Sequence, residues 1–164
     1  MNTSLIRKTI FILCASAGLC LSATALAQAV PTDPLYDQII DSVANADFDA
    51  MASTYHPDAI LVSTIGTKPI ANVIPQWRNS GEQVKEDGGS ASVAFRFSSR
   101  QIDESTGFES GIFRYQSTDA NGNQKTSYVY FESLTINQGG QWLTLMERQK
   151  GPADKAMWEQ LAPR

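Results

Sequence analysis

The sequence predicts an α+β protein in which helices pack on one face of an antiparallel sheet. Between residues 34 and 55, apolar side chains recur at three- and four-residue steps, which is the period of an amphipathic helix. After Gly88-Gly89 they alternate with other side chains, which is the period of a strand, and turn sequences divide this half into several segments. No internal repeat or linker interrupts the pattern, so one domain accounts for it.

The helical part is expected to begin at Pro34. One face of a first helix carries Leu35, Ile39, Ile40 and Val43. A second helix continues the stripe through Phe48, Met51, Ala52 and Tyr55. His56-Pro57 should end it, because the residue before a proline avoids the helical region. Residues 70–77 form a third helical segment, which Pro75 is expected to kink or end.

The strands are expected to follow in sequence order. Ile60-Leu61-Val62 is β-branched and apolar, and Val93, Phe95 and Phe97 then alternate with their neighbours. Residues 112–115 precede a turn at residues 119–123, whose Asn-Gly pair is typical of a hairpin. Residues 127–136 and 142–149 supply two more strands around a turn at 137–140. Pro152 is expected to open a short last helix, whose apolar side is Ala156, Met157, Trp158 and Leu161.

The first 27 residues have the order of a secretory signal peptide. Arg7 and Lys8 precede an apolar run over residues 9–21, and Ala25-Leu26-Ala27 supplies the small residues of a cleavage site. The alternative is an uncleaved membrane anchor, since the apolar run could almost span a bilayer. The sequence therefore predicts cleavage after Ala27, a single domain over residues 28–164, a periplasmic or secreted location, and no membrane association after cleavage.

Composition excludes several functions for such a mature chain. Both cysteines, Cys14 and Cys20, lie in the predicted leader, which leaves no thiol for disulfides, catalysis or metal ligation. Loss of Arg7 and Lys8 leaves 11 basic against 17 acidic residues, a net charge of −6 with His neutral. Such a surface repels phosphate backbones, so no nucleic-acid partner is expected. A single histidine, His56, cannot build a multi-histidine metal site, and we expect neither metal nor cofactor.

Two segments resemble a known superfamily. Residues 45–62 combine Asp47-Phe48-Asp49, an aromatic residue and a Pro57-Asp58-Ala59 turn into a strand, and Gly139-Gly140-Gln141-Trp142 starts the last strand. The pattern is similar to that of the nuclear transport factor 2-like superfamily, which includes SnoaL-like proteins and ketosteroid isomerase. The resemblance covers about residues 35–150. It implies a cone of N-terminal helices packed on a curved, mainly antiparallel sheet, with one open pocket, and it allows a homodimer.

Strand alternation suggests which side chains would line that pocket. Residues two apart share a face, so Tyr128, Tyr130 and Glu132 should lie together, as should Leu143, Leu145, Glu147 and Gln149. The resemblance puts Glu132 at the position of the isomerase's second acidic residue, where a protonated carboxyl donates to an oxyanion. The alternative is that Glu132 and Glu147 face solvent or pair with Arg96, Arg114 or Arg148. The expected ligand pocket comprises Tyr55, Trp77, Phe95, Phe97, Tyr128, Tyr130, Glu132, Leu145, Glu147 and Gln149.

The isomerase mechanism itself is not expected. The resemblance aligns its catalytic base with Ser63 and its tyrosine donor with a position near Ile39, and neither side chain can perform that chemistry. Candidates for any catalysis are Glu132, Glu147 and His56, although His56 could instead stabilise a helix end. Trp77 forms either a pocket lid or part of the core.

Three functions remain open from the sequence. The first is binding of a small, partly apolar molecule in the pocket. The second is an isomerase-, cyclase- or hydrolase-like enzyme that uses a pocket Glu as general acid or base. The third is a homodimeric interaction module with a filled cone and an exposed apolar sheet face.

Overall fold

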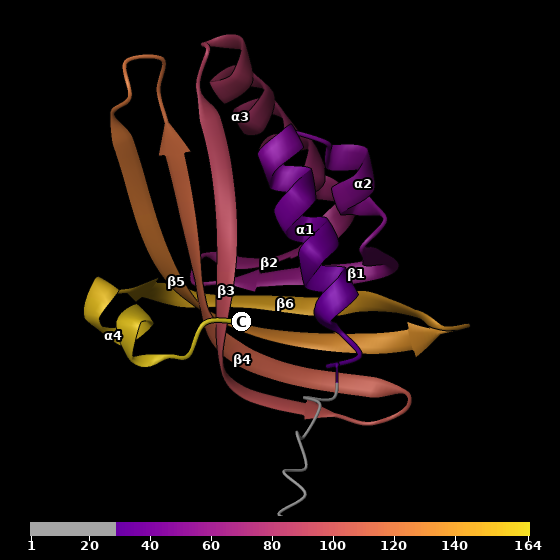
Figure 1. Cartoon of the computed structure of the whole chain (residues 1–164). Coiled ribbons are helices and arrows are strands. Elements are labelled where there is room, and N and C mark those ends of the chain that lie inside the picture. Colours follow the sequence, from indigo (N-terminus) through magenta and orange to yellow (C-terminus); the bar gives the residue numbers. More distant parts are fainter. Residues whose placement is uncertain (1–28) are drawn as a thin grey trace, which may run out of the picture.

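The computed structural model describes residues 29–164 (Figure 1). The predicted signal peptide, its cleavage site and both cysteines lie outside the described residues. Within them, helices α1 (Asp33–Asn45), α2 (Phe48–Ala52) and α3 (Ile74–Glu86) come first in the chain, with strands β1 (Tyr55–Ser63) and β2 (Gly66–Pro69) and the single-turn helix η1 (Ile70–Asn72) between them. Four long strands follow, namely β3 (Ser90–Ile102), β4 (Thr106–Thr118), β5 (Gln124–Gln138) and β6 (Gln141–Ala153), before helix α4 (Lys155–Gln160). The predicted α+β class is confirmed.

The strands form one six-stranded sheet in the order β2-β1-β6-β5-β4-β3. Neighbours pair antiparallel except β1 and β6, which run parallel. Figure 1 shows a strongly curved, unclosed sheet with α1, α2 and α3 on its concave side. This is the cone of helices on a curved, mainly antiparallel sheet that the sequence predicted.

Helices α1 and α2 follow from local sequence signals. Pro34 lies in the first turn of α1, where its missing N–H costs no hydrogen bond. The Asp47 carboxylate accepts a hydrogen bond from the Ala50 N–H at 2.9 Å and so caps α2. Helix α2 is shorter than expected, because it ends at Ala52 and Tyr55 begins β1. His56 and Pro57 therefore lie inside a strand and not at a helix end.

The expectation that Pro75 would kink or end a helix is wrong. Helix α3 starts at Ile74 and continues to Glu86, so Pro75 occupies the first turn. The same residue that would break a helix interior is well suited to a helix start, because its fixed φ matches the helix. Residues 70–72, which the sequence assigned to that helix, form η1 instead.

Three irregularities bend the long strands. Opposite β4, the pairing of β3 shifts between Phe97 and Ser99. Opposite β5, the pairing of β6 shifts twice, at Leu145 and at Lys150. An extra residue in one strand bends it and increases its twist. Such bends allow strands of 13 to 15 residues to curve around the helices.

The tight turn from β3 to β4 is organised by one carboxylate. Asp103 accepts hydrogen bonds from the backbone N–H groups of Ser105 and Thr106 at 2.7 and 2.8 Å, and from both of their hydroxyls. These bonds favour the ionised carboxylate and lower the pKa of Asp103 to about 2. The turn is therefore fixed by a charge that persists well below neutral pH.

Helix α4 covers part of the convex face. The sequence expectation that this helix begins at Pro152 is wrong, since β6 runs to Ala153 and Asp154 caps a helix that starts at Lys155. Trp158 is buried against the sheet, with the Arg96 guanidinium 4.5 Å from its ring centre and the Tyr128 ring 5.8 Å away. Arg96 also donates hydrogen bonds to the carbonyls of Trp158 and Leu161, both at 3.1 Å. The convex face near α4 is thus aromatic and covered.

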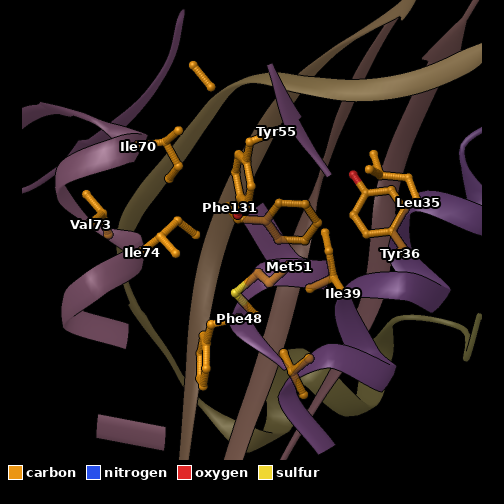
Figure 2. Close-up of a cluster of buried hydrophobic side chains, with 12 residues drawn as sticks. Leu35, Tyr36, Ile39, Phe48, Met51, Tyr55, Ile70, Val73, Ile74 and Phe131 are labelled. Atoms are coloured by element: carbon orange, nitrogen blue, oxygen red, sulfur yellow. The ribbon is translucent and has the colours of Figure 1, made fainter. Parts of the chain in front are cut away.

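The core lies between the helices and the concave face. Figure 2 shows its buried side chains, which come from α1, α2, η1, α3 and the sheet. Phe131 is at its centre, with the rings of Phe95, Phe97 and Phe113 between 5.5 and 6.3 Å away. Full burial of one such side chain contributes roughly 1.5–3 kcal/mol. No helix among residues 29–164 is long and apolar enough to cross a membrane.

Candidate functional site

The concave face and the first three helices enclose a cavity of about 410 Å³. Its walls are mostly aromatic and aliphatic, with a few hydroxyl, amide and carboxylate groups. The helices and β1 contribute Tyr36, Ile39, Val43, Phe48, Met51, Tyr55, Trp77, Ser80 and Gly81. The long strands contribute Ala91, Val93, Phe95, Phe113, Tyr115, Ser127, Val129, Phe131, Ser133, Thr144, Glu147 and Gln149.

Five residues of the expected pocket line this cavity, namely Tyr55, Trp77, Phe95, Glu147 and Gln149. The Tyr55 and Trp77 rings lie 6.4 Å apart and form one wall. Phe97 belongs to the same face but is not a lining residue; it packs edge-on against Tyr36, with ring centres 4.8 Å apart. Trp77 lines the cavity and also packs against the buried core.

Strand β5 presents the opposite face from the one expected. Ser127, Val129, Phe131 and Ser133 line the cavity. Tyr128, Tyr130 and Glu132 alternate with them and point to the convex side. The sequence could not decide between the two sets, because both are apolar or aromatic over residues 128–131. The Tyr128 ring packs against Trp158 of α4, so its aromatic character reflects this contact and not a position in the pocket.

Glu132 is therefore not a pocket acid. It accepts hydrogen bonds from Lys150 at 2.8 Å and Arg148 at 3.1 Å on the convex face. These cations lower the pKa of Glu132, so it remains ionised and cannot donate to an oxyanion. Pairing with Arg148 was the alternative that the sequence left open, and it is the arrangement in the structure.

Strand β6 explains why Glu147 lines the cavity and Leu145 does not. Leu134 pairs with Met146, but Thr135 pairs with Thr144, so Leu145 is the extra residue of a bulge. A bulge shifts the alternation by one position. Thr144, Glu147 and Gln149 consequently share the cavity face, and the expected position of Leu145 is wrong.

Glu147 is held by two neutral donors. The Tyr55 hydroxyl donates to Oε2 at 2.7 Å, and the Gln149 side-chain amide donates to Oε1 at 2.8 Å. Burial, followed by the nearby Glu147 charge and this hydrogen bond, raises the pKa of Tyr55 well above its usual value. Tyr55 is thus a neutral phenol whose proton is committed to Glu147.

A second Tyr–Glu pair lies deeper in the cone. Glu109 is fully buried, and it accepts hydrogen bonds from Tyr36 at 3.0 Å, Thr32 at 2.9 Å and the Arg100 Nε at 2.6 Å. Arg100 also donates to Asp33 at 2.7 Å and to the Thr32 hydroxyl at 2.8 Å. Burial lowers the pKa of Arg100, but hydrogen bonds and charges from Asp33 and Glu109 outweigh it and raise the pKa. Burial and the Glu109 charge raise the pKa of Tyr36 well above its usual value.

These contacts determine what the cavity offers to a ligand. Tyr36 and Tyr55 both line it, yet each uses its phenolic proton on a carboxylate. Neither tyrosine can give that proton to a ligand carbonyl without breaking a hydrogen bond to an acid. Neither phenol is therefore the free donor that an oxyanion site requires.

The remaining sequence candidates lie elsewhere. The His56 Nδ1 accepts the Asp58 N–H at 3.1 Å, and His56 is not among the lining residues. Ser63 donates to the Gly66 carbonyl at 3.1 Å in the β1–β2 turn. Among residues 29–164 there is no group of three or more His, Cys, Asp or Glu side chains placed to hold a metal.

Tyr36, Glu109 and Arg100 were missed as site residues. Tyr36 lies about one helical turn before Ile39, the position where the resemblance looked for a tyrosine. Its presence on the apolar face of α1 was a usable signal. The sequence carried no such signal for Glu109 and Arg100, since a charged residue in a strand is usually at a surface. Only the folded β3–β4 pair, in which they are direct neighbours, brings them together.

Comparisons with known proteins support the fold. No protein-family model matches the sequence, and no curated protein matches it. Solved structures do match. A nuclear transport factor 2-like superfamily protein from Salmonella enterica serovar Typhimurium is 9% identical, with a TM-score of 0.56 over 74% of this chain and 89% of that one.

Two further structures are similar over the same region. A ketosteroid isomerase-like protein from Erwinia carotovora atroseptica is 16% identical, with a TM-score of 0.50 over 74% of this chain and 92% of the other. The CaMKII hub of S. rosetta is 14% identical, with a TM-score of 0.57 over 75% of this chain and 95% of the hub. The chain thus has the nuclear transport factor 2-like fold, as the sequence predicted; at these identities the likeness concerns the fold alone.

Proposed function

We propose that the protein binds a small, partly apolar molecule in the cavity of its cone. The observation that carries this proposal is the cavity of about 410 Å³, whose aromatic walls surround a small set of polar groups. Pockets of this size and composition are typical of small-molecule sites. The committed phenolic protons of Tyr36 and Tyr55 favour binding over an enzyme that would use either of these tyrosines to polarise a substrate carbonyl.

We also propose that the chain is exported and cleaved after Ala27. Its mature form would then meet its ligand in the periplasm or outside the cell. This proposal rests on the signal-peptide pattern of residues 1–27.

The test is native mass spectrometry of the protein isolated from the periplasm or medium, before and after mild denaturation. We expect a chain that begins at Gln28 and an additional mass that is lost on denaturation. The isolated chain should also bind Nile red, a neutral apolar dye, with increased dye fluorescence. A protein with no additional mass and no dye binding would contradict the proposal.

A cavity-filling variant tests the location. Ala91→Trp places an indole in the cavity wall and should reduce Nile red affinity at least tenfold, because the indole occupies the space that the dye requires. Ser92→Trp is the matched control, since the next strand residue points to the opposite face and should leave dye binding unchanged. Equal loss of dye binding in both variants would argue against this cavity.

A homodimeric interaction module is the second candidate, and a row of apolar side chains on the convex face favours it. Ile60 pairs with Met146, Met146 with Leu134, and Leu134 with Phe108, so the row crosses four strands. Ile60 and Phe108 at its ends are 37% and 41% exposed. One similar structure carries the name hub and another the name association domain, which also supports self-assembly.

The dimer proposal predicts a specific change in mass in solution. Phe108→Lys adds a charge to the row and should convert the dimer to monomer in sedimentation velocity experiments at micromolar concentration, since burying an unpaired charge is costly. Ile65→Lys, at the 88% exposed tip of the β1–β2 turn, should leave the dimer intact. A monomeric wild-type protein would contradict this second candidate.

A further inference from the structure

Glu147 differs from the other buried or half-buried acids that line the strands of this sheet. Glu109 is neutralised by Arg100, and Glu132 by Arg148 and Lys150. By contrast, no Lys, Arg or His side chain among residues 29–164 lies within the 4.0 Å limit of an ion pair with Glu147. It is also the single charged residue in the described cavity wall.

Hydrogen bonds within the protein use only part of the acceptor capacity of Glu147. Both oxygens accept, one from the Tyr55 hydroxyl and the other from the Gln149 amide. An ionised carboxylate has about four acceptor positions, so further positions remain for a ligand donor. A ligand that brings donors and a positive charge would complete this site, whereas an anion would be repelled.

The wall next to Glu147 suits a cation as well. The Tyr55 ring, whose hydroxyl contacts Glu147, lies beside the Trp77 ring at a tilt of 51°. Aromatic faces attract ammonium groups within about 6 Å of the ring centre, and Trp is the strongest of them. The rest of the cavity, around Phe95, Phe113 and Phe131, is apolar and fits an uncharged body.

We propose that the ligand is an organic cation, namely a protonated amine carried on an apolar or aromatic body. Its ammonium group donates to Glu147 against the Tyr55–Trp77 wall, and its body fills the cavity towards Phe131. This inference rests on the proposed function, because it assigns a ligand class to the same cavity.

Three probes of similar size test the charge preference. Naphthylethylamine, naphthylethanol and naphthylacetate share an aromatic body and differ in carrying a positive, zero or negative charge at neutral pH. Isothermal titration calorimetry should show that the amine binds at least tenfold more tightly than the alcohol, which corresponds to about 1.4 kcal/mol. The acetate should bind more weakly than the alcohol.

The same titrations with Glu147→Gln locate the preference. The amide keeps the shape of the side chain and removes the charge, so the amine should fall to the affinity of the alcohol while the alcohol is unchanged. Glu132→Gln is the matched control on the convex face and should alter none of the three affinities. Thermal melting of each variant checks that it is folded. The comparison of the three probes on the wild-type protein tests the charge preference even if a variant fails to fold.

The outcomes separate this inference from the proposal on which it rests. Equal affinities for amine and alcohol, or an amine preference that survives Glu147→Gln, would overturn the cation inference and leave cavity binding intact. Binding of Nile red without binding of any of the three probes would do the same. Failure of all three probes and of Nile red would overturn both.

Discussion

Arg100→Met should lower the free energy of unfolding by about 3–5 kcal/mol. Arg100 is the only cation that contacts Glu109 among the described residues, and Glu109 is fully buried. Methionine fills a similar volume but leaves a carboxylate in the core with only the hydroxyls of Tyr36 and Thr32. An uncompensated buried charge is among the most destabilising changes that a single substitution can make.

The control is the other type of ion pair in the same sheet. Arg148→Met removes a partner of Glu132 from the convex face, where Arg148 is exposed and Lys150 remains. Exposed pairs contribute about 0–1 kcal/mol, so this variant should differ from wild type by less than about 1 kcal/mol. Urea denaturation of both variants, with unchanged slopes, gives the comparison. Equal losses of unfolding free energy in the two variants would show that buried Glu109 does not depend on Arg100 more than Glu132 depends on Arg148.

A double variant separates lost charge pairing from lost packing. Glu109→Gln in the Arg100→Met background removes the unpaired charge and keeps an acceptor for Tyr36 and Thr32. We expect it to restore part of the stability, which a double-mutant cycle would report as a coupling energy between the two residues. The absence of any recovery would attribute the loss to the packing of Arg100 on Phe97, where the two groups are 4.0 Å apart.

The sequence predicted best those elements whose apolar residues lie on one side only. Helix α1 is such a case, since Leu35, Tyr36 and Ile39 are buried while the residues between them are more exposed. Strand β3 is another, with Val93 and Phe95 towards the cavity. In both, periodicity alone identifies the face that packs on the rest of the molecule.

Sequence reasoning failed where both faces of a strand are covered or where a strand is irregular. β5 packs its odd-numbered residues on the core and Tyr128 on α4, so alternation could not tell the faces apart. The bulge at Leu145 has no sequence signature, yet it decides that Glu147 faces the cavity. β2 was missed because its four residues, Gly66 to Pro69, are all exposed and carry no hydrophobic pattern.

Gly111→Ala should be the most disruptive small-to-large change in the sheet, with an expected loss of about 3 kcal/mol, at the upper end of overpacking effects. A Cβ at this position would lie 2.1 Å from the Arg96 carbonyl oxygen and 2.9 Å from the Phe97 Cα. Both obstacles are backbone atoms of the neighbouring strand, next to the shift in the β3–β4 pairing. Relief requires the two strands to separate, which would disturb Arg96 at α4 and Phe97 at Tyr36.

Gly107→Ala, four residues earlier in β4, provides the contrast. There the nearest obstacle is the Thr135 hydroxyl at 2.5 Å, which is the end of a side chain. We expect a loss of roughly 1–2 kcal/mol, and Thr135→Ala should rescue part of it by removing that atom. No single side-chain truncation can rescue Gly111→Ala, because its obstacles belong to the main chain. Chemical denaturation of the two glycine variants, each with and without a truncated neighbour, tests whether the close approach of β3 and β4 at Gly111 is needed for the cone. A Gly111→Ala protein as stable as wild type would show that this close approach is not needed.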